Sequence, residues 1–507
     1  MKKGEGIYDL VVIGAGTAGL VTAAGTAGLG GRVALIERNL MGGDCLNFGC
    51  VPSKALISSA RLIQEIRESE KWGLDQQEPQ FVFEKIFERM RERRAKIAPH
   101  DSRERFESLG VDVFHGEARF VSPQEIEINI SPSPQSSPPG RGGNPASGEV
   151  QRLRAKNLVI ATGSRATIPT IEGINNVPYF TNETIFDGLK GKPENMIVLG
   201  GGPIGCELAQ TFCRLGTQVT IIQRGEQLLP REDRDVAEFL ERRLINEGVR
   251  VIKNVDARAV ATSDAGNVTL EFLDRQSGGL AERTVFADAL LVATGRSPNL
   301  EGLDLKSAGV EFNERGLRVT DYLQTSQRHI YAAGDVIGPF LFTHMADAQA
   351  RVVVRNILMP FQFLRQKMNY SVVPWCTYTD PEVAHVGLGE KEAQQRNLDY
   401  DLFVVLLEDI DRAVVESEEA GFGKILTQKG SDKILGATIV APHAGDLLHE
   451  FVLAMKAGIG LATIASTIHA YPTFAELARK AGDKYNRTRL TPTAKKLFAW
   501  LYARAGK

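Results

Sequence analysis

A glycine-rich turn near the N-terminus constrains the fold of this chain more than any other feature. The turn has glycine at three positions, Gly14, Gly16 and Gly19. It follows the apolar run 7–13 and precedes an alanine-rich stretch, an order that predicts a buried parallel strand, a tight turn and a helix. The first two glycines let the backbone approach a pyrophosphate, and the third permits close packing of helix against strand. A second strand, 33–37, ends at Glu37, whose carboxylate can accept hydrogen bonds from a ribose.

The same order recurs 186 residues later. An apolar strand at 196–199 leads into a turn whose glycines are Gly200, Gly202 and Gly205, and another strand follows at 219–222. Each unit is followed by a short strand that ends in Ala-Thr-Gly, with the glycine at Gly163 and Gly295. Two such units predict two separate doubly wound α/β domains, each with a nucleotide site.

Composition excludes several classes of protein. A length of 507 residues predicts about three domains, and a formal net charge of −2 gives no electrostatic reason to expect nucleic-acid binding. The five cysteines are too few and too scattered for a secreted disulfide framework, so we expect a cytoplasmic protein. The N-terminus imitates a signal peptide, but Asp9 and the glycines that follow indicate strand and turn. No other apolar run is long enough to predict a transmembrane helix.

Two cysteines, Cys45 and Cys50, stand five residues apart shortly after the strand 33–37. A metal site is disfavoured because no second Cys/His pair lies at ligand spacing, and structural zinc needs about four ligands. Two inert thiols would leave the following Pro-Ser-Lys run, which ends at Lys54, without an explanation. A redox pair gives each of these residues a role. One thiolate attacks the substrate, the other exchanges electrons with a cofactor, and the positive charge of Lys54 favours the thiolate. We therefore predict a redox-active disulfide and no resident metal.

The second glycine turn differs from the first at the tip of its second strand. An NAD site has an acid there, which binds the 2′-hydroxyl of the ribose. This chain has Gln223 and Arg224, with Arg231 nearby. A neutral amide beside a guanidinium tolerates a 2′-phosphate, so we expect NADPH rather than NADH, although Arg224 could also be an ordinary surface arginine.

With these motifs the chain resembles the class I pyridine nucleotide–disulfide oxidoreductases, the family of glutathione reductase, lipoamide dehydrogenase and mercuric reductase. The resemblance rests on both glycine turns, the Cys-x4-Cys-x-Pro-Ser-Lys run, both Ala-Thr-Gly turns and the run from Tyr331 to Asp335. It covers nearly the whole chain. It implies an FAD enzyme with two Rossmann-like domains, for FAD and NAD(P), and a C-terminal α+β dimerisation domain.

The expected division of the chain follows from this resemblance and from composition. The limits are 1–165 and 295–366 for the FAD domain, 166–294 for the NAD(P) domain, 367–490 for the dimerisation domain and 491–507 for a terminal amphipathic helix. Residues 131–148, rich in Pro, Ser and Gly, are expected to form a disordered surface insertion. The terminal helix can be capped by Thr491. We expect its apolar face to pack in the dimer, with a membrane or a partner protein as the alternative.

The resemblance also implies roles for individual residues. Cys50 resembles the cysteine beside the flavin, and Cys45 resembles the interchange cysteine that meets the substrate. Lys54 is expected near the flavin and paired with Glu207. The other implied cofactor contacts are Gly116 and Ala118 at the adenine, Asp335 at the ribityl or phosphate portion, and His344 in a helix aimed at the flavin's pyrimidine ring. Electrons are expected to pass from NADPH through FAD and the Cys45–Cys50 pair to the substrate.

One departure from the family concerns the substrate. Members that act on dithiols or disulfides carry His-Pro-Thr-x-x-Glu near the C-terminus, and the histidine exchanges protons with the substrate thiol. This chain has Tyr471 before the proline and Glu476 at the acid position. Mercuric reductases also have tyrosine before the proline. At neutral pH a phenol, whose pKa is ~10, is a poorer proton shuttle than an imidazole, whose pKa is ~6.5. His469 lies two residues upstream and could substitute only if it pointed to the site.

Two further departures bear on the same question. Mercuric reductases deliver the metal through a C-terminal cysteine pair, whereas no cysteine follows Cys376 here. Asp44 stands where the family commonly has threonine, and a carboxylate there disfavours the Cys45 thiolate unless it points to solvent.

The sequence thus predicts a homodimeric FAD enzyme that uses NADPH to reduce a thiophilic metal ion or a similar acceptor, with Tyr471 and Glu476 completing the partner subunit's site. The alternative is a dihydrolipoyl dehydrogenase or another disulfide reductase. A third possibility is a flavoprotein that is docked to a partner or a membrane through 491–507.

Overall fold

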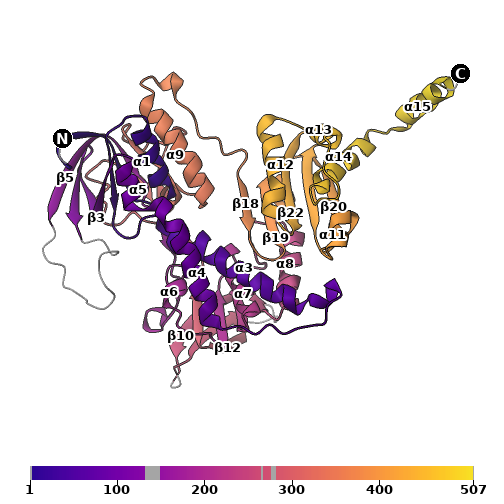
Figure 1. Cartoon of the computed structure of the whole chain (residues 1–507), viewed down its shortest axis with the longest axis horizontal. Coiled ribbons are helices and arrows are strands. Elements are labelled where there is room, and N and C mark those ends of the chain that lie inside the picture. The colour runs from indigo at the N-terminus through magenta and orange to yellow at the C-terminus, as the bar shows by residue number, and fades with distance from the viewer. Residues whose placement is uncertain (1–2, 132–148, 264–265, 276–280, 506–507) are drawn as a thin grey trace.

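The computed structural model describes residues 3–131, 149–263, 266–275 and 281–505 (Figure 1). From residue 132 on, the expected insertion 131–148 lies outside the described residues. The predicted fold class is confirmed: parallel sheets with helices occupy the first two thirds of the chain, and an antiparallel sheet with helices follows. The domain limits given above stay a prediction.

The first parallel sheet contains the strands expected at 7–13 and 33–37, and its core strands run β3-β2-β1-β5-β17. β4 joins the outer halves of β3 and β5 in an antiparallel meander. Helices α1 and α9 pack on each other beside this sheet (Figure 1). Its elements are β1 Ile7–Ile13, α1 Thr17–Gly28, β2 Val33–Glu37, α5 Arg103–Ser108, β3 Val111–Ser122, β4 Glu125–Ile130, β5 Val150–Ile160, β17 Ile330–Ala332 and α9 Thr343–Leu358.

The second parallel sheet has the order β13-β7-β8-β9 and contains the strands expected at 196–199 and 219–222. An antiparallel sheet, β10-β11-β12, completes this part. Its elements are α6 Ile185–Gly188, β7 Asn195–Leu199, α7 Pro203–Arg214, β8 Gln218–Gln223, α8 Arg234–Asn246, β9 Arg250–Lys253, β10 Val255–Thr262, β11 Val268–Asp274, β12 Ala281–Ala287 and β13 Ala289–Val292. Two small strand pairs, β6 Ser164–Ala166 with β14 Arg296–Pro298 and β15 Phe312–Asn313 with β16 Gly316–Leu317, form separate sheets, and Leu317 belongs to the buried apolar cluster of the first parallel sheet.

The C-terminal sheet is antiparallel, in the order β18-β19-β22-β21-β20, and carries helices α12 to α14 (Figure 1). Its buried apolar residues form a core of their own, centred on residues such as Phe451 and Ile439. Its elements are β18 Pro374–Thr377, β19 Glu382–Gly387, α10 Glu390–Gln395, β20 Tyr400–Leu406, α11 Asp411–Val415, β21 Phe422–Gln428, β22 Ile434–Ala441, α12 Ala444–Ala457, α13 Leu461–Ser466 and α14 Glu476–Thr488.

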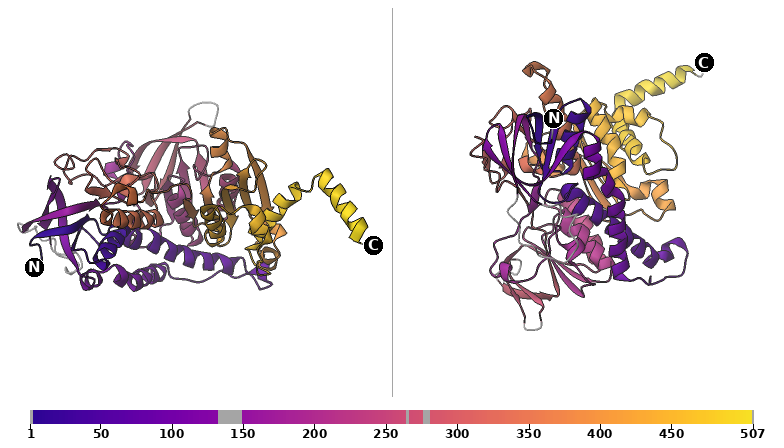
Figure 2. Two further views of the ribbon diagram at one scale, coloured as in Figure 1. Left: turned by 90° about the horizontal axis from the view of Figure 1, so that it is seen from above. Right: turned by 60° about the vertical axis from the view of Figure 1, so that its left-hand side comes forward.

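Three helices, α2 Gly43–Asn47, α3 Cys50–Arg67 and α4 Phe83–Ile97, link the first two parts of the chain. α3 packs against α4 and against α7 of the second parallel sheet. The last helix, α15 Pro492–Ala505, stands away from the rest of the molecule in both views of Figure 2. As expected, Thr491 caps it, since the Ala494 amide donates to Thr491 Oγ1 at 3.2 Å. None of the described helices is long and apolar enough to cross a membrane.

A buried ion pair connects the second parallel sheet to the C-terminal part. The side chain of Arg214, at the end of α7, is 3% exposed and donates to Glu247 at 2.7 Å. It also donates to Asp380 at 2.9 Å. Such a charge is stable only while its partners remain, because water cannot reach it.

We expect Arg214→Ala to lower the free energy of unfolding by about 3 kcal/mol, near the lower end for a buried pair because Arg243 also contacts Glu247. Urea unfolding followed by tryptophan fluorescence measures the change. The matched control is Arg234→Ala, which removes an 82% exposed arginine paired within α8 and should cost less than about 1 kcal/mol. Equal losses in the two variants would contradict the structural role of Arg214.

Candidate redox and nucleotide-binding site

The two glycine turns have the same backbone geometry. Gly14 has φ 102°, and a Cβ there would lie 2.4 Å from the carbonyl oxygen of Ala161. Gly200 has φ 112°, and its Cβ would lie 2.4 Å from the carbonyl oxygen of Ala293. Only glycine fits such positions. The third glycine of each turn has still less space for a side chain. A Cβ on Gly19 would lie 1.8 Å from the Gly14 carbonyl oxygen, so only glycine fits at that position of the helix.

The middle glycines are different, because packing within the protein does not require them. A Cβ on Gly202 would meet nothing within 4 Å, and one on Gly16 would meet only Gly43 Cα, at 3.9 Å. A Cβ on Gly163 or on Gly295 would likewise meet no described atom within 4 Å. The turns therefore hold open space at the N-termini of α1 and α7. This arrangement fits a nucleotide pyrophosphate, which binds backbone amides at a helix N-terminus.

The tips of the second strands also correspond. Glu37 is buried and accepts from the amide of Ala15, at 2.6 Å from Oε2. In the second unit Gln223 Oε1 accepts from the amide of Gly201 at 2.9 Å. The neighbouring Arg224 is 86% exposed and has only a loose ion pair, 3.6 Å from Asp256. An exposed guanidinium thus stands beside the position where the first unit has a carboxylate.

The other expected cofactor residues lie around the first sheet. Gly116 and Ala118 are on β3 where it leaves β2 and pairs with β4. Asp335, just after β17, accepts from Ser164 Oγ at 2.5 Å, and burial raises its pKa. The ring of His344, at the start of α9, donates to the Pro374 carbonyl oxygen at 2.8 Å, and burial lowers its pKa.

The cysteine pair is held against the first glycine turn. The Gly42 amide donates to the Ala15 carbonyl oxygen at 3.0 Å. A Cβ on Gly43 would lie 2.6 Å from Gly16 Cα, so glycine at both positions permits this approach. Cys45 lies in α2, and Cys50 is the first residue of α3. The fold thereby brings the predicted redox pair and the first nucleotide turn together.

The pKa values of the two thiols are shifted in opposite directions. A hydrogen bond from Cys45 lowers the pKa of Cys50 to about 6, and the charge of Lys54 contributes in the same direction. The hydrogen bond to Cys50 raises the pKa of Cys45, and burial adds to the effect. Thr343 Oγ1 lies 3.5 Å from Cys50 Sγ. Above a pH of about 6 the reduced pair therefore carries one thiolate, which these interactions favour on Cys50, while the proton stays on Cys45.

Lys54 lies one turn along α3 from Cys50, and its Nζ donates to Glu207 Oε2 at 2.7 Å. Burial opposes its charge, yet Glu207 raises the pKa of Lys54 above the usual value, so the ammonium stays charged. The ammonium also lies 4.4 Å from the ring centre of Tyr378. The packing of α3 on α7 thus joins two expected catalytic residues that are far apart in sequence.

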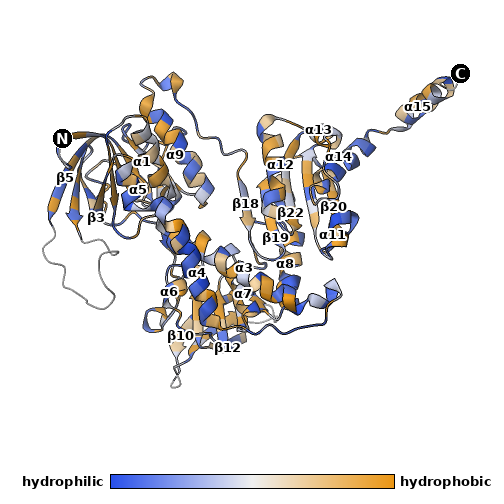
Figure 3. Ribbon diagram, viewed as in Figure 1, coloured by the Kyte–Doolittle hydropathy of each residue, from blue (hydrophilic) through white to orange (hydrophobic). Residues whose placement is uncertain are grey.

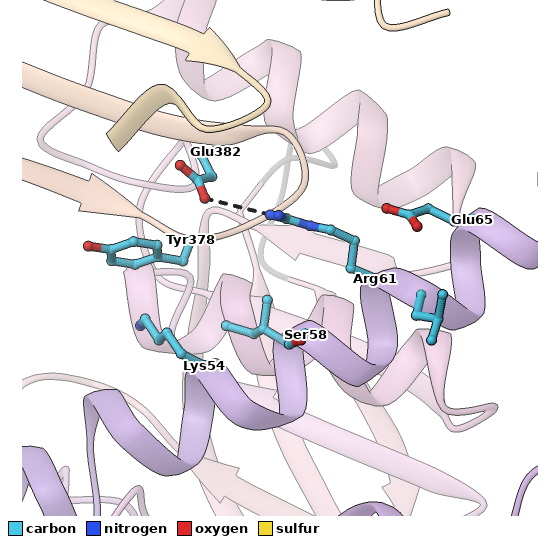
Figure 4. A pocket seen from close by; sticks show the side chains of 8 residues that line it. Lys54, Ser58, Arg61, Glu65, Tyr378 and Glu382 are labelled. Atoms are coloured by element: carbon cyan, nitrogen blue, oxygen red, sulfur yellow. Dashed lines mark ion pairs between the residues drawn. The ribbon is translucent and has the colours of Figure 1, made fainter. Parts of the chain in front are cut away.

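A cavity of about 350 Å³ opens beside Lys54, between α3 and the segment that carries Tyr378 and Glu382 (Figure 4). Arg61 projects from α3 toward Glu382, with 3.6 Å between the charged groups. Tyr378 and Glu382 approach it from the C-terminal part of the chain. No sequence signal pointed to these three residues, because they come together only through the packing of separate parts of the chain.

The Asp44 side chain is 38% exposed, but its carboxylate also has partners within the protein. Its Oδ1 lies 3.1 Å from a guanidinium nitrogen of Arg296 and accepts from Asn182 at 3.2 Å. Its charge is among the smaller influences that raise the pKa of both cysteines, and Arg296 offsets part of that charge. Arg296 also lies 3.7 Å from Asp335. Sequence reasoning missed this role of Arg296, although the residue follows directly on the second Ala-Thr-Gly turn.

Within one chain, no hydrogen bond or ion pair among the described residues joins the C-terminal candidates to the cysteines. Tyr471 is 70% exposed and donates to Asp411 at 2.8 Å, which raises its pKa. Glu476 is buried and accepts from Arg479 at 2.8 Å. His469 is bound to Glu450 at 2.9 Å. Each of these three side chains thus has its own local partner.

We expect the Cys50 thiolate of the reduced enzyme to disappear as the pH falls through about 6, because the folded pKa lies below its usual value of 9.0. The ultraviolet thiolate absorbance, taken as the difference from Cys50→Ser, measures this titration. Lys54→Met should move the midpoint to higher pH, since it removes a positive charge. An unshifted midpoint near 9.0 in the unmodified enzyme would refute the assignment.

Comparison with known proteins agrees with this geometry. Residues 8–350 match the family profile described as "Pyridine nucleotide-disulphide oxidoreductase", and residues 373–481 match the dimerisation domain of the same family. A mercuric reductase of Lysinibacillus sphaericus is 32% identical over 95% of this chain and 83% of its own length. A dihydrolipoyl dehydrogenase of Chlamydia muridarum is 32% identical over 93% of this chain and 95% of its own.

A solved structure gives the same result. The Cu(II) complex of the HOCl-induced flavoprotein disulfide reductase RclA from Escherichia coli aligns with a TM-score of 0.80 and 26% identity, over 94% of this chain and 99% of that one. The open space at both glycine turns fits the cofactors of these enzymes. The chain therefore belongs to the pyridine nucleotide–disulfide oxidoreductase family, whose members bind FAD and use NAD(P)H.

Proposed function

We propose that this enzyme uses NADPH to reduce a thiophilic metal ion, such as Hg(II), at the Cys45–Cys50 pair. When bound, FAD supplies a two-electron relay between the nicotinamide and the cysteines. Gly14, Gly16 and Glu37 would hold the FAD nucleotide, and Gly200, Gly202 and Arg224 would hold that of NADPH. The proposal rests on one observation: the Tyr471 hydroxyl donates its proton to a hydrogen bond with Asp411.

Disulfide exchange needs a base, because a thiolate is the attacking group and Cys45 holds the proton of the reduced pair. Tyr471 is a poor base: its pKa is raised by the Asp411 carboxylate, and its hydroxyl proton is already donated there. Both ring nitrogens of His469 already have partners, since Nε2 lies 2.9 Å from a Glu450 carboxylate oxygen and Nδ1 lies 2.9 Å from the Thr467 carbonyl oxygen. The described part of the chain therefore offers no free imidazole at the position where the family has its proton shuttle.

A soft metal ion needs no such base. Metal binding to a thiol releases the proton, so Hg(II) itself can convert Cys45 to a thiolate. The two thiolates would then each give up one electron to the metal ion, which is reduced to the element while Cys45 and Cys50 join as the disulfide. The similarity to mercuric reductases, and to a flavoprotein solved with Cu(II), supports this class of acceptor.

We also propose that the active unit is a homodimer. Residues 373–481 match the family's dimerisation domain, and Tyr471 and Ile468 are 70% and 96% exposed in the single chain. In this proposal Tyr471 and Glu476 complete the site of the partner subunit.

The acceptor is tested by NADPH oxidation with Hg(II) in excess thiol, with lipoamide and with glutathione disulfide. We expect fast turnover with Hg(II), loss of it in Cys45→Ser, and slow turnover with both disulfides. Tyr471→His should raise disulfide turnover by about tenfold or more, since it restores a base. Tyr471→Phe is the control, because it also breaks the bond to Asp411 but adds no imidazole. Fast lipoamide turnover with NAD(H) in the unmodified enzyme would refute both the acceptor and the cofactor.

The preference for NADPH is tested by Arg224→Ala. We expect its KM for NADPH to rise by about 10- to 100-fold. This rise corresponds to the loss of charge-assisted hydrogen bonds that contribute about 1.5–3 kcal/mol. The KM for NADH should stay the same, since NADH has no 2′-phosphate. Arg234→Ala, which removes a similarly exposed arginine from α8, should change neither KM. Equal changes for both cofactors would count against a 2′-phosphate contact.

A further inference from the structure

We propose that α15 binds the surface of a lipid bilayer that carries anionic headgroups, and so attaches the enzyme peripherally to a membrane. The helix buries none of its residues and stands away from the molecule (Figure 1, Figure 2). Its large apolar side chains are all exposed, at fractions between 46% and 81%: Leu497, Phe498, Trp500, Leu501 and Tyr502. No other helix in the described part of the chain carries so many exposed large apolar residues in succession.

The side chains of α15 are sorted around the helix. With about 100° per residue, Leu497, Phe498 and Leu501 lie on one side. Trp500 and Tyr502 stand on the two flanks of this apolar side, and Figure 3 shows hydrophobic and hydrophilic residues interleaved along the helix. Aromatic rings at the edge of an apolar face suit the boundary between headgroups and acyl chains, where one end of the ring is apolar and the other is wet.

The charges have one sign. From residue 484 to the end of the chain every charged residue is basic, although the whole chain has a formal net charge of −2. These residues are Lys484, Arg487, Arg489, Lys495, Lys496, Arg504 and Lys507. Within the helix Lys496 lies opposite the apolar side and Lys495 lies beside Tyr502 on one flank. Arg504 lies at the other edge of the apolar side, with its guanidinium carbon 4.1 Å from the centre of the Trp500 ring. Basic residues near a bilayer are attracted to anionic headgroups.

The same features disfavour two copies of α15 packing on each other. A twofold contact would place one basic helix against an identical one, and the like charges would repel. An anionic lipid surface instead offers both an apolar layer for the leucines and phenylalanine and a complementary charge for the lysines.

The test is sedimentation of the purified holoenzyme with vesicles of phosphatidylcholine alone and of phosphatidylcholine mixed with phosphatidylglycerol. We expect binding to the mixed vesicles, weaker binding to the neutral ones, and loss of binding as salt screens the charges. Leu501→Glu should weaken binding by about tenfold or more, because a buried leucine contributes about 1.5–3 kcal/mol. Ala499→Glu is the matched control: it adds the same charge on the opposite side of the helix and should weaken binding much less.

Four outcomes would overturn the proposal. Three of them are no binding to mixed vesicles, equal binding to both kinds of vesicle, and equal losses in Leu501→Glu and Ala499→Glu. A fourth is a change from dimer to monomer in light scattering when the chain ends at Leu490, which would show that α15 packs between copies. Turnover in solution should be the same in all of these variants, since α15 buries none of its residues against the described part of its own chain.

Discussion

The close backbone contact between the first glycine turn and the cysteine loop is the constraint on which the site depends. Gly14 lies against Ala161, and Gly43 lies against Gly16, with no room for a Cβ at Gly14 or Gly43. These contacts hold α1, the Ala-Thr-Gly turn and α2 together at one end of the first parallel sheet. The open side of Gly16 then faces the space that the turn leaves for a ligand. A nucleotide bound there necessarily lies close to Cys45 and Cys50.

Charge balance around the cysteines is the second organising feature. Lys54 favours the Cys50 thiolate and is itself held by Glu207. On the other side Asp44 opposes both thiolates, while Arg296 offsets it. Each of these charges near the pair has a partner of opposite sign. The hydrogen bond between the two thiols remains the largest influence, and it lowers the pKa of Cys50 while raising that of Cys45.

The site is assembled from parts of the chain that lie far apart in sequence. Glu207 comes from the second nucleotide unit, Thr343 from α9 and Tyr378 from the segment after β18. α3 is the common support, because it begins at Cys50, carries Lys54 and packs on α7. α15 has no share in this assembly, and its exposed apolar side is therefore available for a different role.

Much of the fold followed from local pattern. β1 and β2 coincide with the runs 7–13 and 33–37, and the second unit agrees to within a residue, because apolar strands bounded by glycine turns leave few alternatives. Thr491 also caps α15 as expected, since a cap involves only neighbouring residues. The pairing of Lys54 with Glu207 could be anticipated only from the family, because nothing in the sequence between them signals the contact.

The sequence by itself determined the nucleotide turns, the cysteine pair and the missing histidine at Tyr471, since each depends on residue identity at short spacing. Only the tertiary structure decided which charges meet. It placed Arg296 beside Asp44, Asp411 beneath the Tyr471 hydroxyl and Glu450 on His469. These contacts arise from the packing of distant segments, which short-range pattern does not encode.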